Sequence, residues 1–292
     1  DPDDLAASLD APDSPFLNRA LESYAVGSVF KPVLAAAALE QGILPEYECT
    51  GAMVVDGQIF RCAGGVPHGT VDMTAALEKS CNGYFIRLGQ QLGAESLLDA
   101  AKAFGFGKSL PLAEGLAAEA GQLPAPQELA QSGQLANFSF GQGSLLATPM
   151  QVAALFNTLA ADGVYRAPYV LQATLDETTG RPVGNLSHPR GRRVISAQNA
   201  ALLRAMLVQV VQQGTAQDAA GLSGGAGGKT GTAQTGQFTP EGTERCNLWF
   251  AGFWPAEKPR YTIVVLQDGA IHTAYSGADI FAQVCNALEA AG

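Results

Sequence analysis

Apolar residues recur at helical spacing in several stretches of the chain. The first runs from Ser28 to Gly42, where valine, leucine, phenylalanine and alanine favour a helix and Gly42 supplies a stop. Pro32 falls in its first turn, where the missing N–H costs little. Helical patterns also dominate residues 71–162, although glycine and proline interrupt them, and a further helix is predicted over about residues 196–214.

The C-terminal segment, residues 277–291, has the pattern of an amphipathic helix. Its residues Ile280, Val284 and Leu288 fall on one stripe. An apolar stripe of this kind must be covered, so we expect it to pack against a sheet.

Two apolar runs near the C-terminal end, residues 247–253 and 261–266, are typical of strands. They follow residues 229–233, which come after a glycine-rich stretch and are interpreted as a third strand. Residues 165–193 are loop-rich. The pattern predicts an α+β fold, in one domain that covers residues 1–292.

Composition narrows the class of protein. The chain has 292 residues and is 47% hydrophobic, which is enough for one sizeable core. There are 27 acidic against 17 basic residues, which argues against nucleic acid as a partner. No apolar run has the length of a membrane span, and no signal-peptide pattern is found at Asp1.

Three short motifs occur once each in a fixed order and carry the candidate chemistry. The first is Ser28-Val29-Phe30-Lys31. Residues three apart on a helix share a face, so Lys31 lies about one turn from Ser28. A serine hydroxyl is a weak nucleophile unless a neighbouring base takes its proton, and a buried lysine with a lowered pKa can be that base. Taken alone, this motif would be read as a helix cap followed by a solvated lysine.

The second motif, Ser80-Cys81-Asn82, follows a predicted helix that ends near Lys79, and Asn82-Gly83 is a turn signal. A short loop here would point a hydroxyl and an amide toward the Ser28–Lys31 pair. Ser80 could relay a proton to a leaving amine, and Asn82 could bond both Lys31 and a substrate carbonyl. The alternative interpretation is an ordinary turn at a helix end.

The third motif, Lys229-Thr230-Gly231, continues into Thr232 and is predicted to be a strand that borders the site. Gly231 would let a substrate backbone approach closely. The cation and the hydroxyls of the other three residues suit a carboxylate, and an extended peptide could add to such a strand. A nucleotide-binding loop is rejected, because Ser223 stands where its first glycine is required.

Together the motifs are similar to the signature of penicillin-binding proteins and class A β-lactamases. The resemblance extends over nearly the whole chain, through Asn18-Arg19-Ala20, the Gly141-Gln142-Gly143 segment with Thr148-Pro149, and residues 249–253. It is nearest to the transpeptidase domains of the class B type. The implied fold is β-lactamase/transpeptidase-like, an antiparallel sheet flanked by helices with a helical subdomain.

The resemblance implies an enzyme that cross-links peptidoglycan by attacking D-Ala-D-Ala stem peptides, and that β-lactams acylate. It implies that Ser28 is the nucleophile, Lys31 its base, and that Ser80 and Asn82 shuttle protons and orient substrate. The carboxylate would be held at Lys229, Thr230 and Thr232, beside Gly231. Backbone N–H groups of Ser28 and Thr232 would form the oxyanion hole.

The implied partners are stem peptides and β-lactam antibiotics, together with other cell-wall synthesis proteins. No cofactor and no metal are implied. The location would be the extracytoplasmic face of a bacterial membrane, on an N-terminal anchor outside this chain. Two positions depart from the family pattern. Val26 stands where proline is usual, and Gly83 stands where threonine is common.

Other functions stay open. A β-lactamase would add rapid hydrolysis, but Glu114, Glu119 and Glu128 lie outside the class A setting for a deacylating base. A D,D-carboxypeptidase would trim the same peptide. A non-enzymatic penicillin sensor would need a signalling segment that this chain does not show.

Family members carry two sheet strands before the acylation-site helix. Residues 1–28 contain no strand-like stretch, because aspartate, proline, serine and asparagine dominate them, and Asp1-Pro2-Asp3 resembles the loop that follows those strands. We therefore expect the two N-terminal strands to be missing. Residues 261–266 would then be an exposed edge.

The cysteine count is odd, so at least one of Cys49, Cys62, Cys81, Cys246 and Cys285 is unpaired within a monomer. Cys49 and Cys62 flank a strand-like segment and could form a disulfide. A zinc site at these two residues and His68 is rejected, because the sequence offers no C-x-x-C spacing and no fourth ligand. Cys81 is interpreted as a small buried residue, and His188 and His272 as solvated.

Overall fold

The computed structural model describes residues 9, 11, 14–171, 173–183, 189–271 and 273–291. The predictions about residues 1–3, His188 and His272 concern positions outside these ranges. Within them the fold is α+β, as the sequence predicts. No helix in the described ranges combines the length and the apolar character required to cross a membrane.

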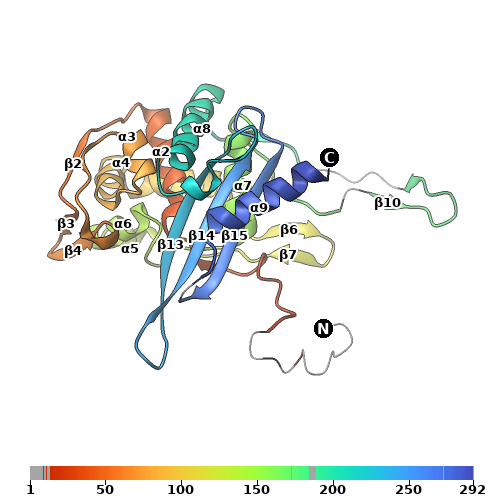
Figure 1. Cartoon of the computed structure of the whole chain (residues 1–292), viewed down its shortest axis with the longest axis horizontal. Coiled ribbons are helices and arrows are strands. Elements are labelled where there is room, and N and C mark those ends of the chain that lie inside the picture. The colour runs from red at the N-terminus through yellow and green to blue at the C-terminus, as the bar shows by residue number, and fades with distance from the viewer. Residues whose placement is uncertain are drawn as a thin grey trace.

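One antiparallel sheet of three long strands organises the fold. Its order is β13 (Gly227–Phe238), β14 (Glu244–Trp254) and β15 (Tyr261–Ala270). Glycines in β13 bring its backbone close to its neighbours, since a Cβ on Gly228 would come 2.8 Å from the carbonyl oxygen of Ala251. The β13–β14 hairpin projects beyond the body of the molecule (Figure 1).

Helices cover this sheet and form a second lobe beside it (Figure 1). Helix α9 lies across the front of the sheet, α7 packs behind it, and α8 packs against β13. The helices and the first 3-10 turn are η1 (Gly27–Phe30), α2 (Lys31–Gln41), α3 (Met73–Glu78), α4 (Asn82–Ala103), α5 (Pro126–Leu129), α6 (Ser132–Ser139), α7 (Pro149–Ala160), α8 (Ala197–Gln212) and α9 (Gly277–Ala290).

Short strands decorate the helical lobe and the periphery. Those beside the active-site helices are β2 (Tyr47–Cys49), β3 (Ala52–Val55), β4 (Gln58–Arg61) and β5 (Gly69–Val71). The others are β1 (Tyr24–Ala25), β6 (Leu110–Ala113), β7 (Leu116–Ala118), β8 (Leu146–Ala147), β9 (Val164–Tyr165), β10 (Thr174–Leu175), β11 (Pro182–Val183) and β12 (Arg192–Arg193). The 3-10 turns η2 (Ala63–Gly65) and η3 (Gln217–Ala219) complete the described elements.

Helix α2 runs through the centre of the core. Its residues are buried from Lys31 to Leu39, so it is apolar on all sides and not amphipathic. Gly42 ends it in the left-handed conformation with φ +67°, as the sequence predicts. A central helix of this kind holds the Ser28–Lys31 pair in a fixed place.

The C-terminal helix packs against the sheet as predicted, and Leu288 is partly buried against the core, but the most buried stripe is offset by about one residue from the prediction. The side chains of α9 that are buried are Ala278, Phe281 and Cys285, and the ring of Phe281 packs edge-on against Phe250 of β14. Val284 is 38% exposed. Phe281 is the largest side chain on this helix, and its burial sets the rotation of α9 against the sheet.

The edge predicted for residues 261–266 exists in the described sheet. There β15 pairs with β14 and with no second strand, although α7 and α9 cover its faces. Its side chains from Tyr261 to Gln267 are all half-buried. The prediction of two missing N-terminal strands remains a prediction.

Candidate active site

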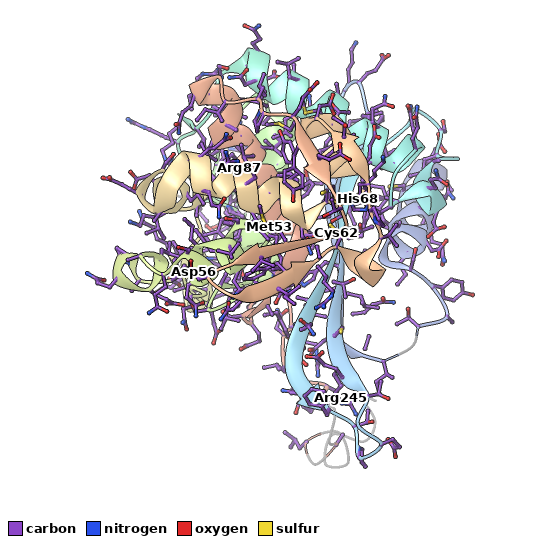
Figure 2. The ribbon with its side chains drawn as sticks, turned by 90° about the vertical axis from the view of Figure 1, so that its left-hand side faces the viewer. Met53, Asp56, Cys62, His68, Arg87 and Arg245 are labelled. Carbon is purple, nitrogen blue, oxygen red and sulfur yellow. The ribbon has the colours of Figure 1, made fainter. Side chains whose placement is uncertain are left out.

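The three motifs meet at one cleft of about 910 Å³. Its lining includes Ser28 from η1, Ser80 from the link before α4, Asn82 from the start of α4, and residues 230–232 of β13. Residues 59–61 of β4 also line it. Figure 2 shows the β3–β4 hairpin, which carries Met53 and Asp56, across the near face, and Cys62 and His68 just beyond its end.

Lys31 is fully buried behind this cleft. Its Nζ donates hydrogen bonds to the Ser80 carbonyl oxygen at 2.8 Å, to the Ser80 Oγ at 3.1 Å and to the Asn82 Oδ1 at 2.8 Å. The ring of Phe85 lies 5.4 Å from the same nitrogen. The structure thus joins the first two motifs through one amine, as the sequence predicts.

Burial lowers the pKa of Lys31 to about 7, and Coulombic interaction with the nearby Cys81 and Cys62 opposes that shift in part. A lysine with this pKa is neutral in a large fraction of molecules at neutral pH. Its lone pair is then available to accept a proton from Ser28, one helical turn away.

The link that carries the second motif differs from the prediction. Asn82 begins α4 and is not part of a turn, and the direction change falls at Ser80, whose φ is +51°. Cys81 is the N-cap residue. The Asn82 side chain also donates from Nδ2 to the Arg61 carbonyl oxygen at 2.8 Å, which ties the helix start to β4.

The glycine that replaces the common threonine has a packing reason. Gly83 is buried in the first turn of α4, directly beneath Tyr47 of β2. A Cβ at position 83 would come 2.7 Å from the Tyr47 hydroxyl oxygen and 2.8 Å from its ring. The glycine makes room for the aromatic ring and does not mark a turn.

The third motif separates its residues between the two faces of β13. Side chains alternate along a strand, so Thr230 and Thr232 point to the cleft while Lys229 does not. Lys229 is fully buried, and its Nζ donates to the Thr230 carbonyl oxygen at 3.2 Å. Burial, followed by the charge of Lys31, lowers the pKa of Lys229 well below its usual value.

Glycine contacts bring η1 and β13 together. A Cβ on Gly27 would come 2.7 Å from the Thr232 carbonyl oxygen, and one on Gly231 would come 3.1 Å from the Val29 nitrogen. Gly27 also donates to the Gly141 carbonyl oxygen at 2.8 Å. The predicted oxyanion donors, the N–H groups of Ser28 and Thr232, therefore belong to segments in direct contact.

The sequence analysis missed several residues of the cleft. Thr215, just beyond α8, lies 2.6 Å from Thr230 between their Oγ1 atoms and lines the cleft. Trp249 of β14 also lines it and donates from Nε1 to the Ala25 carbonyl oxygen at 2.9 Å. The glycine at position 214 predicts the end of α8 and so a loop at Thr215, but no short sequence motif assigns Thr215 or Trp249 to the cleft.

The predictions for the cysteines need two corrections. All five cysteines are free thiols, and Cys49 is not bonded to Cys62. The argument against a metal, that a fourth ligand is lacking, is also wrong, because Cys81 lies with Cys49, Cys62 and His68 in one group. Cys81 is buried, as expected. The strand–turn–helix path brings together residues whose spacing in sequence gives no sign of it.

The cleft thus places Ser28 beside the Lys31 amine of lowered pKa, which is hydrogen-bonded to the Ser80 hydroxyl and the Asn82 amide. The β13 strand adds Thr230 and Thr232, whose side chains face the cleft. This set suits acyl transfer from a substrate that carries a carboxylate. None of the described residues that line the cleft is an aspartate, a glutamate or a histidine.

Comparison with known proteins gives a consistent result. The sequence model of the penicillin binding protein transpeptidase domain matches residues 2–288. The peptidoglycan D,D-transpeptidase PbpA of Mycolicibacterium smegmatis is 33% identical over 99% of this chain and 60% of its own length. The stage V sporulation protein D of Bacillus subtilis is 31% identical over 97% of this chain and 44% of its own length.

Solved structures agree with the fold. A ceftriaxone acyl-enzyme complex of penicillin-binding protein A from M. tuberculosis is similar with a TM-score of 0.85 and 28% identity, over 98% of this chain and 64% of that one. Penicillin binding protein 3 from the same organism, complexed with aztreonam, gives a TM-score of 0.83 and 30% identity, over 96% and 65%. The chain spans 44 to 60% of the two curated relatives.

Proposed function

The chain belongs to the penicillin binding protein transpeptidase domain family, and from this premise we propose that it is a peptidoglycan D,D-transpeptidase. It forms a serine acyl-enzyme with the D-Ala-D-Ala end of a stem peptide and transfers the acyl group to an amine of a second stem. β-Lactams acylate the same serine. The substrate class follows from the relative PbpA of Mycolicibacterium smegmatis, which is named a peptidoglycan D,D-transpeptidase.

The acylation step uses Lys31 and one of its half-buried hydrogen-bond partners, Ser80. Neutral Lys31 takes the proton of Ser28 as Oγ attacks the carbonyl carbon of the penultimate D-Ala. The N–H groups of Ser28 and Thr232 stabilise the oxyanion. Collapse breaks the C–N bond, and the proton passes from Lys31 through the Ser80 hydroxyl, 3.1 Å away, to the departing D-Ala amine.

The second half of the cycle reverses these roles. An acceptor amine attacks the ester carbonyl, and its proton returns through Ser80 to Lys31 and then to Ser28. The new amide leaves with the second stem peptide, so no proton or electron is gained or lost overall.

Recognition of the terminal carboxylate falls to the cleft face of β13. The hydroxyls of Thr230 and Thr232 donate to it, with Thr215 supporting Thr230. Lys229 acts from behind the strand through its charge, because its amine is fully buried. An arriving carboxylate favours the protonated form of Lys229 and so offsets the effect of burial.

One observation carries the proposal: a fully buried Lys31 whose amine is held by both polar groups of the second motif. An ordinary helix lysine would be solvated. A buried amine of lowered pKa beside a serine is costly for stability and is what an activated nucleophile needs.

Hydrolysis by the same acyl-enzyme is disfavoured by the lining of the cleft. A β-lactamase needs a base that activates water, and no described lining residue is acidic. Glu119 and Glu128 are occupied elsewhere, by the Ser23 nitrogen at 3.0 Å and the Ser144 hydroxyl at 2.7 Å. A long-lived adduct is therefore expected. Trimming by water in place of the acceptor amine gives the carboxypeptidase variant of the same chemistry.

The setting follows from the substrate. Stem peptides lie outside the cytoplasmic membrane, so the domain acts on the extracytoplasmic face and is held there by a segment outside this chain. Other cell-wall synthesis proteins are its expected partners.

Intact mass spectrometry after mixing with benzylpenicillin tests the proposal. We expect a mass increase of one intact penicillin, stable for many minutes, and none in Ser28→Ala with an unchanged melting temperature. Adduct formation in Ser28→Ala at the rate of the unaltered chain would refute the assignment of the nucleophile. Rapid loss of the adduct with product accumulation would identify a β-lactamase instead.

A further inference from the structure

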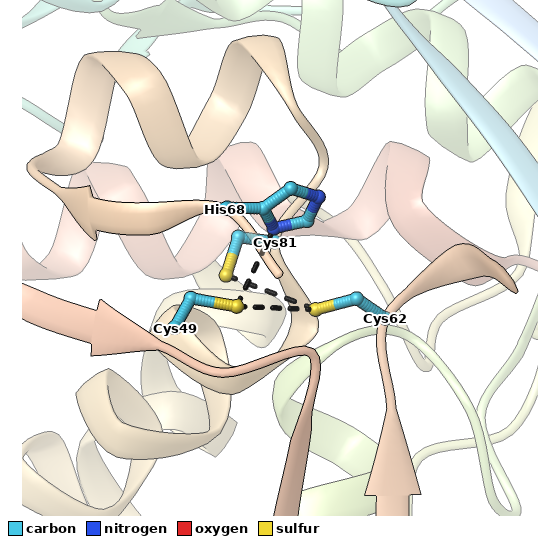
Figure 3. A group of neighbouring side chains, drawn as sticks. All are labelled: Cys49, Cys62, His68 and Cys81. Atoms are coloured by element: carbon cyan, nitrogen blue, oxygen red, sulfur yellow. Dashed lines mark hydrogen bonds between the residues drawn. The ribbon is translucent and has the colours of Figure 1, made fainter. Parts of the chain in front are cut away.

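Four metal-ligating side chains converge beside the active site. Cys49 ends β2, Cys62 follows β4, His68 precedes β5 and Cys81 caps α4. Figure 3 shows them pointing toward one another from four backbone segments. Each residue offers one ligand atom, and these atoms all lie within 4.8 Å of one another.

The separations match the edges of a tetrahedron around zinc. The distance from Cys49 Sγ is 3.7 Å to Cys62 Sγ and 3.5 Å to His68 Nδ1, and Cys62 Sγ lies 3.9 Å from Cys81 Sγ. Bond lengths of about 2.3 Å for Zn–S and 2.0–2.1 Å for Zn–N give S–S edges of about 3.8 Å and S–N edges of about 3.6 Å. Three of the six edges thus have the length that a zinc coordination shell requires, and the other three are no longer than 4.8 Å.

Backbone N–H groups at the start of α4 donate to two of the sulfur atoms. Cys62 Sγ accepts hydrogen bonds from the backbone N–H groups of Gly83 and Asn82, and Cys81 Sγ accepts one from that of Tyr84. These donors are the first N–H groups of α4, a helix of 22 residues whose N-terminal end attracts negative charge. The three cysteines are at most 4% exposed.

Backbone bonds hold the ligands in place independently of their side chains. The His68 N–H donates to the Cys49 carbonyl oxygen at 3.1 Å, and the Cys62 N–H donates to that of Gly51 at 2.9 Å. Lys79 Nζ donates to the His68 carbonyl oxygen at 3.1 Å. A metal would therefore meet a formed site and would not have to create one.

We propose that Cys49, Cys62, His68 and Cys81 bind one Zn²⁺ ion in a closed tetrahedral site. Thiolate and imidazole ligands in this geometry select zinc among the common divalent ions. Four protein ligands leave no open position, so the ion is structural. Three thiols release their protons to solvent as it binds, and the loaded site carries one net negative charge.

The position of Cys81 in the second motif connects the ion to the active site. Cys81 stands between Ser80 and Asn82, the two residues that hold Lys31, and Cys62 stands next to Arg61, whose carbonyl accepts from Asn82. The ion fixes the link at Ser80 and thereby positions both acceptors of the lysine amine. This positioning role rests on the proposed function, whereas the ion's presence does not.

A disulfide between Cys49 and Cys62 is the competing explanation. It would require their sulfur atoms to close from 3.7 Å to about 2.05 Å. It would also not explain why the side chains of Cys81 and His68 converge on the same place. The same four atoms are all explained by a single ion.

Zinc content by elemental analysis of protein purified without chelators tests the site. We expect one zinc per chain, at least a tenfold loss of affinity in Cys62→Ser, and full content in the matched control Cys246→Ser. Replacement of zinc by Co²⁺ should give the strong visible absorption of a tetrahedral thiolate site. His68→Ala, a half-exposed ligand, serves the same test if Cys62→Ser does not fold.

Acylation measured on the same samples separates this inference from the proposed function. Ser28→Ala should lose penicillin labelling and keep its zinc, whereas His68→Ala should lose zinc and label more slowly. Failure of the reduced chain to retain Zn²⁺ after incubation and desalting would overturn the metal site, as would a Cys49–Cys62 disulfide in the purified chain. Unchanged labelling of metal-free His68→Ala would overturn the positioning role alone.

Discussion

Two buried amines of the same charge lie near one another at the residue scale. Lys31 has three hydrogen-bond acceptors, whereas Lys229 has one, the Thr230 carbonyl oxygen. The charged form is therefore better supported at Lys31. The charge of Lys31 also disfavours protonation of Lys229, and this repulsion is, after burial, a cause of the lowered pKa of Lys229. The described lining of the cleft thus contains no carboxylate, and the groups that can accept a proton there are the two lysine amines of lowered pKa.

The pKa of Lys31, lowered to about 7 chiefly by burial, predicts how acylation depends on pH. Only the neutral amine accepts a proton, and its fraction falls about tenfold for each unit of pH below the pKa. The second-order rate constant for acylation should fall in this way below about pH 7 and level off above it. Stopped-flow measurement with a chromogenic β-lactam checks this. A rate that is flat from pH 5 to 8 would exclude Lys31 as the base, as would a Lys31→Ala variant that loses less than about a hundredfold.

The buried position of Lys229 predicts a selective defect. Lys229→Ala should slow acylation by carboxylate-bearing β-lactams and leave their esters nearly unaffected, because only the acid gains from the charge behind β13. Paired rate constants for an acid and its ester give the comparison. Equal slowing of both would assign Lys229 to the chemistry of Ser28 and not to carboxylate recognition.

At the element scale, the start of α4 contacts both the Lys31 amine and the cysteine group. Its first turn supplies Asn82 to Lys31 and N–H groups to the sulfurs of Cys62 and Cys81. Sequence patterns predicted the helices around it but not this start, because Asn-Gly is a turn signal that local propensity alone cannot override. The glycine at position 83 is explained by a contact with Tyr47, which is distant in sequence and packs on Gly83.

The contact of Gly83 with Tyr47 predicts the effect of restoring the common family residue. Gly83→Thr should destabilise the chain by about 1–3 kcal/mol, the usual cost of overpacking. The added Cβ would lie 2.7 Å from the Tyr47 hydroxyl. Thermal and denaturant unfolding measure the change.

A double variant serves as the control for that packing effect. Tyr47→Ala combined with Gly83→Thr should cost less than the sum of the two single changes, because removal of the ring removes the clash. Strictly additive costs would show that the strain at position 83 has another source.

At the scale of the whole molecule, long-range packing explains what could and could not be predicted. The motifs, the α+β class and the order of strands follow from local patterns in sequence. The rotation of α9 and the group around Cys49 and Cys81 do not, because they depend on which side chains meet across elements. Phe281 against Phe250 and Cys62 against Cys81 are contacts of this kind.

The open edge of the described sheet predicts self-association. Among the residues that the structure describes, strand β15 pairs with β14 alone. Its residues from Tyr261 to Gln267 are half-buried, although helices cover both faces. An edge of this length with Ile263, Val264 and Val265 offers unpaired backbone groups to a second copy. Light scattering should therefore show a mass that rises from one chain toward two as concentration increases. Thr262→Lys, which places a charge on the edge, should shift that rise to higher concentration, whereas Thr178→Lys on the exposed β10–β11 hairpin should not. A strictly monomeric chain at high concentration would contradict the prediction, as would equal effects of the two lysine variants.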